Sequence, residues 1–193
     1  MNAKRKTRKH AESKSNLFDA DALEELSRLF HETRQTLGPK QADADWMSDP
    51  LDEWLANLDS GETVLDCDTM AAFAVGMNET LSQLMEFAAR PHSKRNKRRM
   101  GELLTVAFED EGIVPDKERC HAGIAMLLDI ADAAPVPYCV QPLAVVAYTL
   151  WWLGDSRAVT MALQCLLLDE ECSLAAMVFS AAQRGVAPAW CSG

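Results

Sequence analysis

The feature that most constrains the fold of this chain is a nearly continuous apolar run from Leu143 to Leu153, interrupted by Thr149. The run is too short to cross a bilayer as a helix, which needs roughly 20 apolar residues. A helix that is apolar on every side has to be covered by other elements on most of them. The run therefore predicts a central helix surrounded by other helices, and no membrane span.

The rest of the chain shows helical spacing of apolar residues and no alternating apolar/polar pattern of the kind that strands produce. Apolar residues recur at intervals of three and four, and capping, glycine and proline signals separate the segments. The expected helices cover 19–37, 51–58, 68–89, 97–111, 115–134, 140–153, 156–168 and 172–184. We therefore predict an all-α fold, a helical bundle of about seven or eight helices.

Charge and composition divide the chain into three parts. The sequence holds 29 acidic and 19 basic residues, but most of the basic ones gather in two clusters, which leaves the remaining body strongly acidic. Residues 1–16 are basic and poor in apolar side chains, which predicts a disordered tail. Residues 17–60 are expected to form N-terminal helices with an acidic linker over 38–50. Residues 61–193 are expected to form a helical domain.

The two basic clusters are candidates for contact with an anionic partner. Lys and Arg side chains bind phosphate backbones by displacing counterions, without reading the base sequence. Neither cluster contains an aromatic residue on which a base would stack. The alternatives are a solvated loop or pairing with the acidic body of the chain. The candidate contacts are Lys4, Arg5, Lys6, Arg8, Lys9, Lys94, Arg95, Lys97, Arg98 and Arg99.

A second candidate for partner binding is the acidic segment 45–58, which contains two tryptophans. Apolar residues on one face of a short acidic helix would dock in the groove of a protein partner. The alternative is that this segment folds back onto the helical body. The candidate docking residues are Leu51, Trp54, Leu55 and Leu58.

No segment carries the signature of an enzyme, a metal site or a cofactor site. The four histidines lack paired ligand spacing, and the sequence has no glycine-rich phosphate loop or nucleophile turn. Its six cysteines include no Cys-x-x-Cys pair, which favours reduced thiols over a disulfide or metal role. We therefore predict no catalytic, metal or cofactor-binding residues. The basic N-terminus leads into polar residues where a signal peptide would have an apolar stretch, which predicts a cytoplasmic protein.

Within residues 138–187 the chain resembles a tetratricopeptide repeat. The resemblance rests on residues 147–155, which end in Trp151-Trp152-Leu153-Gly154-Asp155, and on Ala158 and residues 165–169. Cys165 stands where the repeat prefers alanine, and the stretch after Asp155 is one residue short. One complete helical hairpin and one following helix are expected, fewer than the three or so repeats of a stable array.

A longer stretch, residues 117–190, resembles the C-terminal end of an actinobacterial family known as domain of unknown function 4192. The shared features are an alanine- and leucine-rich helix, the break at Pro135 and Pro137, the Gly154-Asp155 turn and an ending of the form Gly-x-x-Pro-x-Trp at 185–190. That family has no assigned activity. The resemblance therefore implies a fold and no chemistry.

These observations predict a non-enzymatic helical protein that acts as a protein–protein interaction module. Its partner is another protein or a second copy of the chain. The alternative is a nucleic-acid-associated accessory or regulatory protein that uses the basic tail and the 94–99 cluster.

Overall fold

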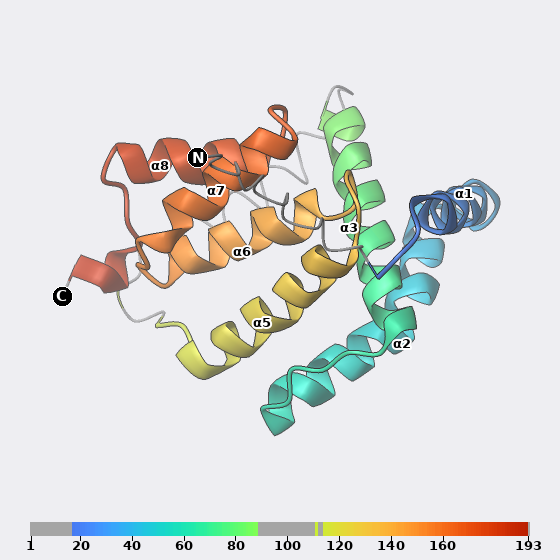
Figure 1. The fold of residues 1–193 in the computed structure, drawn as a ribbon, viewed down its shortest axis with the longest axis horizontal. Helices are drawn as coiled ribbons and strands as arrows, with labels where there is room; N and C mark the ends of the chain where they lie inside the picture. Colours follow the sequence, from blue (N-terminus) through green and yellow to red (C-terminus); the bar gives the residue numbers. More distant parts are fainter. Residues whose placement is uncertain (1–16, 89–110, 112–113, 193) are drawn as a thin grey trace, which may run out of the picture.

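The computed structural model describes residues 17–88, 111 and 114–192 (Figure 1). This part of the chain forms seven α-helices and a short terminal 3-10 helix, with no strand among the described residues, which confirms the predicted all-α bundle. None of the described helices is long and apolar enough to span a membrane. The helices are α1 (Ala20–Leu37), α2 (Pro39–Ser60), α3 (Cys67–Ala88), α5 (Lys117–Ala133), α6 (Val140–Trp152), α7 (Arg157–Leu168), α8 (Ser173–Gln183) and η2 (Ala189–Ser192).

Helices α1 and α2 form a hairpin around a sharp break in the chain. Gly38 has φ 82°, a conformation that L side chains rarely adopt, and it ends α1. Pro39 then occupies the first turn of α2, where its missing N–H costs nothing. The rings of Phe30 and Trp46 stack across the hairpin with centroids 4.5 Å apart. The turn and this aromatic contact together fix how α2 folds back on α1.

Residues 39–50, predicted to be an acidic linker, belong instead to α2. Alanine and proline side chains within this stretch are buried, at Ala42 and Pro50. The indole N–H of Trp46 also donates a hydrogen bond to the carbonyl of Ala72 on α3, at 3.1 Å. Tertiary burial of this kind overrides the weak helix propensity of an Asp-rich stretch and the cost of an internal proline. The predicted helix over 51–58 was therefore too short, because α2 begins at Pro39 and includes the whole stretch that was expected to be a linker.

Helix α3 lies between the α1–α2 hairpin and the C-terminal helices, and it contacts α1, α2, α5 and α6 (Figure 1). It begins after Asp66, whose carboxylate accepts the backbone N–H of Thr69 at 2.7 Å. Phe73, Ala74 and Val75, in its N-terminal half, are buried. Because α3 is shared, buried residues from both ends of the described chain form one hydrophobic cluster.

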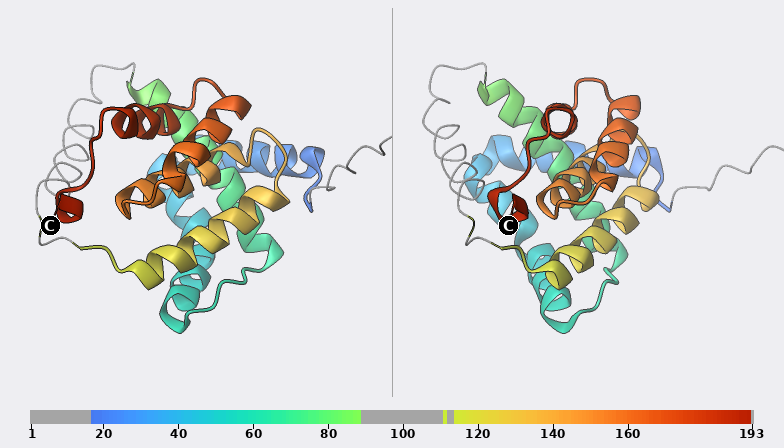
Figure 2. Two further views of the ribbon diagram at one scale, coloured as in Figure 1. Left: turned by 60° about the vertical axis from the view of Figure 1, so that its left-hand side comes forward. Right: turned by 90° about the vertical axis from the view of Figure 1, so that its left-hand side faces the viewer.

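Helix α6 lies at the centre of the C-terminal part, as its apolar sequence predicts. It contacts α3, α5, α7 and α8, and seven of its residues are buried. Figure 2 shows α7 and α8 packed on one side of it and α5 on another. Small buried residues, Ala158, Ala162 and Ala175, allow α7 and α8 to approach closely. The α6–α7 hairpin is thus present, while its likeness to a tetratricopeptide repeat stays a prediction.

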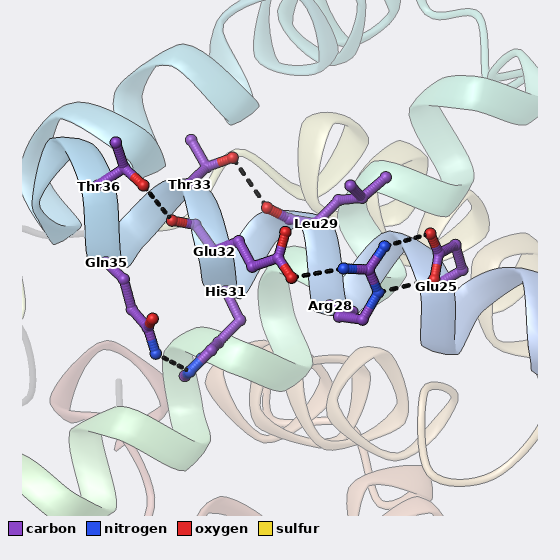
Figure 3. Close-up of polar contacts among 8 residues, drawn as sticks. All are labelled: Glu25, Arg28, Leu29, His31, Glu32, Thr33, Gln35 and Thr36. Atoms are coloured by element: carbon purple, nitrogen blue, oxygen red, sulfur yellow. Dashed lines mark hydrogen bonds and ion pairs between the residues drawn. The ribbon is translucent and has the colours of Figure 1, made fainter.

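Polar side chains on the outer face of α1 pair with one another. Arg28 pairs with Glu25 and Glu32, one turn before and one turn after it on the helix (Figure 3). His31 and Gln35 form a hydrogen bond of 2.8 Å on the same helix. Such pairs between neighbours three and four residues apart support the helix. This face therefore presents charges that are already partnered within α1.

Candidate protein-docking groove

The four predicted docking residues on α2 divide between the surface and the core. Leu51 and Leu55 are 43% and 48% exposed. Trp54 and Leu58 are half-buried and pack against the core. The Trp54 ring lies 5.0 Å from the ring of Phe73 on α3. Helix α2 therefore folds back onto the body through Trp54 and Leu58, which was the alternative considered from the sequence, and leaves two leucines at the surface.

An apolar groove of about 350 Å³ lies beside these residues, where α2, α3, α5 and α6 meet. Its size falls within the range of about 300–1,000 Å³ that is usual for ligand pockets. None of the described residues that line it is charged. The lining residues are Met47, Trp54, Phe73, Gly76, Met77, Leu127 and Val145. We call this the α2–α3 groove.

Gly76 is the reason that Met47 can lie across α3 in this groove. A Cβ atom at residue 76 would lie 3.1 Å from the Met47 sulfur and 3.5 Å from the Trp46 indole nitrogen. Met47 and Met77 thus come from different walls of the same groove. Methionine side chains are unbranched and polarisable, so they adapt to partners of different shape. The groove therefore combines two packed aromatic rings, Trp54 and Phe73, with two adaptable methionines.

Acidic side chains lie on the outer side of the α2 wall. Asp45, Asp49 and Asp52 are exposed on the same helix that supplies Met47 and Trp54. Leu51 and Leu55 lie on the same helix as these carboxylates and are exposed as well. At about 100° per residue, these carboxylates lie on one face of α2, and the groove-lining Met47 and Trp54 lie on the opposite face. Only a partner that extends past the groove and over α2 would meet these carboxylates, and positive charge on that extension would complement them.

A second exposed apolar patch lies on α7. Leu167 is 86% exposed, and Leu163 and Leu168 are 42% and 43% exposed. Leu163 and Leu167 are one helical turn apart, so they share a face of α7. The patch belongs to a helix that does not line the α2–α3 groove. It serves below as a control surface.

A second pocket is lined by polar and charged residues. It has a volume of about 730 Å³ and lies between the C-terminus of α2 and the N-terminus of α5. Its charged residues include Arg119, which forms an ion pair with Asp59. Burial, followed by the charge of Asp116, raises the pKa of the neighbouring Cys120 thiol. The reactive thiolate form is thus disfavoured next to this pocket.

No group of three or more potential metal ligands occurs among the described residues. The ten basic residues proposed to contact anions, in the 1–16 tail and the 94–99 cluster, lie outside the described residues. Contact with nucleic acid therefore stays a prediction.

Comparison of the chain with protein-family models, curated proteins and solved structures found no match. The resemblance to the domain of unknown function 4192 stays a prediction on the residues that carry it. In the structure, those C-terminal residues fold back on α6. The indole of Trp190 donates to the carbonyl of Trp152 at 3.1 Å, and that of Trp151 donates to the carbonyl of Val186 at 2.9 Å.

The sequence indicated two of the helix faces that line the α2–α3 groove, but it did not indicate that they lie next to each other. The apolar seam of α3, including Met77, and the α2 residue Trp54 were each visible as helical spacing. Leu127 and Val145 are contributed by α5 and α6, which lie far away in the sequence. Periodicity within one helix carries no information about which other helix completes a groove.

Proposed function

We propose that this protein is a non-enzymatic interaction module, and that the α2–α3 groove receives apolar side chains of a helical segment in a protein partner. The observation that carries the proposal is that every described residue lining the groove is apolar or glycine, with Met47 on α2 and Met77 on α3. Amphipathic helices bind in grooves of this kind through side chains spaced three and four residues apart. The exposed Leu51 and Leu55 extend the contact surface along α2.

The charge on α2 favours a basic partner segment. Asp45, Asp49 and Asp52 are exposed on the face of α2 that points away from the groove. Complementary charge at the rim of an interface speeds association and selects among partners, while the apolar centre supplies most of the affinity. We therefore expect a partner helix with an apolar face, followed or preceded by Lys or Arg residues that reach the outer face of α2.

The proposal is tested by a charge placed in the groove. Met77→Glu puts a carboxylate into the apolar lining, whereas Met77→Leu keeps the site apolar at similar volume. Proteins retained from a native extract by the tagged wild type and by each variant are quantified by mass spectrometry. We expect one or more proteins to bind the wild type and Met77→Leu. Their affinity for Met77→Glu should be at least about tenfold lower, which corresponds to about 1.4 kcal/mol.

Leu167→Glu provides the matched control, because it places the same charge on the apolar patch of α7. Binding that survives Leu167→Glu and fails with Met77→Glu supports the groove. Binding that fails with Leu167→Glu and survives Met77→Glu contradicts it and moves the interface to α7. Circular dichroism of both variants verifies that the helices remain folded.

The nucleic-acid alternative has a separate test. Binding to nonspecific DNA and RNA is measured over a salt series, since phosphate contacts weaken steeply as salt rises. Absence of binding at low salt would rule this alternative out.

A further inference from the structure

Two buried cysteines lie next to each other where α7 turns into α8. The Sγ atoms of Cys165 and Cys172 are 3.7 Å apart, and the two residues are 0% and 2% exposed. Cys165 lies near the end of α7, and Cys172 is the residue immediately before α8. A disulfide requires about 2.05 Å between the sulfurs, so the two atoms need to approach by about 1.7 Å.

The surroundings make the two thiols unequal. The single S–H hydrogen of Cys165 has two acceptors within reach, the Val140 carbonyl at 3.2 Å and the Cys172 sulfur at 3.7 Å. The Cys165 thiol, followed by the backbone N–H groups of Ala175 and Leu174 in the first turn of α8, lowers the pKa of Cys172 against the opposing effect of burial. The bond to Cys172, together with burial, raises the pKa of Cys165. The thiolate is the reactive form of cysteine, and a position at a helix N-terminus favours it by lowering the pKa of the thiol. Cys172 is therefore the attacking sulfur and Cys165 the proton-bearing partner.

We propose that Cys165 and Cys172 are a redox-active thiol pair, which hydrogen peroxide converts to an internal disulfide joining α7 to α8. This inference rests on residues away from the α2–α3 groove and does not depend on the proposed function. It also departs from the expectation of plain reduced thiols. The pair is separated by six residues in the sequence, so a search for closely spaced cysteines does not find it.

The reaction proceeds in two steps. The Cys172 thiolate attacks one peroxide oxygen, the O–O bond breaks, and the departing hydroxide takes up a proton to leave as water; Cys172 becomes a sulfenic acid. The Cys165 sulfur then attacks the Cys172 sulfur, the S–O bond breaks, and hydroxide leaves as water with the Cys165 proton. Two thiols and one peroxide thus give one disulfide and two waters.

The position of the pair permits access by a small oxidant. The turn between the helices includes Glu170 and Glu171, which are exposed, and Glu171 directly precedes Cys172. Helix α8 packs on α6 and α7 alone among the described elements with appreciable contact. Opening of such a terminal helical hairpin requires less free energy than global unfolding. Peroxide is small enough to reach the sulfurs during that opening.

The test uses the folded protein and the peptide that carries both thiols. The reduced chain is treated with hydrogen peroxide, quenched, unfolded, alkylated with iodoacetamide and cleaved with trypsin. Cleavage after Arg157 and Arg184 releases residues 158–184, which contain Cys165 and Cys172 and no other cysteine. We expect this peptide to lose both alkylation sites and the mass of two hydrogen atoms, and to recover both sites after dithiothreitol.

Variants separate the pair from its neighbours. Cys172→Ser should slow the loss of alkylatable Cys165 at least tenfold, while Cys139→Ser, at another buried thiol, should leave the 158–184 result unchanged. The proposal is overturned if both thiols of the wild type stay alkylatable once the exposed Cys67 is fully oxidised. It is equally overturned if Cys165 or Cys172 gains oxygen without forming the internal disulfide. The wild-type result alone decides, even where a serine disturbs the fold.

Discussion

Replacing Gly154 by alanine should destabilise the α6–α7 turn more than the same change at Gly185. Both glycines have left-handed φ values, 69° and 68°. A Cβ atom at residue 185 meets nothing within 4 Å, whereas one at residue 154 lies 2.9 Å from the sulfur of Cys191. The two positions thus share the backbone cost and differ in the steric one.

The magnitudes follow from these two costs. The left-handed conformation costs a non-glycine residue about 1–2 kcal/mol, partly offset by the about 0.4–1 kcal/mol that alanine gains by restricting the unfolded chain. Gly185→Ala should therefore cost about 1 kcal/mol. The atom that is crowded is the side-chain end of the partly exposed Cys191, so crowding adds about 1 kcal/mol, the lower end of the usual range, and Gly154→Ala should cost about 2 kcal/mol.

Urea unfolding followed by circular dichroism measures both values, and a double mutant isolates the contact. Cys191→Ala removes the sulfur and leaves a Cβ atom 4.0 Å from the added one, an ordinary van der Waals contact. When Cys191→Ala is added to Gly154→Ala, most of the stability that was lost to the steric contact should return. Equal losses at Gly154 and Gly185, or no recovery in the double mutant, would refute the packing of the C-terminal segment against this turn.

Two further predictions concern ionised side chains. Arg34 is 7% exposed and pairs with Asp43 at 3.0 Å, so Asp43→Ala, which leaves a buried charge alone, should cost about 3 kcal/mol in urea unfolding, while Arg34→Met should cost clearly less. Asp66 accepts the backbone N–H of Thr69, and this hydrogen bond is the main reason that the pKa of Asp66 lies below its ordinary value of 3.8. The stabilisation is present above pH 3.8 and is lost as the pH falls through the lower pKa of the folded state. Asp66→Asn should therefore reduce the loss of stability on acidification below about pH 4, and an unchanged acid profile would contradict the cap.

The sequence predicts the C-terminal helices well because local signals mark their ends. Asp116 caps α5 by accepting the N–H of Arg119, and Gly154 ends the α6 segment with positive φ. These signals act within a few residues, so they are visible in the sequence. The predicted starts and ends of α5 to α8 lie within two residues of those observed.

The N-terminal half of α2 could not be predicted in the same way. Its helix exists because Trp46 stacks on Phe30 and bonds to Ala72, contacts that join three helices. Local composition, rich in Asp and interrupted by Pro50, favours a linker. The meeting of Cys165 with Cys172 also depends on how α8 returns along α7. Both features are set by tertiary packing that periodicity does not encode.

The central claim is that a protein partner contacts the α2–α3 groove, and site-specific photo-crosslinking tests it most directly. A benzophenone-bearing amino acid is placed at Leu51, on the α2 wall, and in a separate chain at Leu29 on α1; both leucines are 43% exposed, so accessibility is matched. After irradiation in the native cells, adducts are identified by mass spectrometry. We predict a discrete protein adduct at residue 51 that Met77→Glu abolishes, and none of that identity at residue 29. The same adduct at both positions, or none at residue 51, would contradict the account.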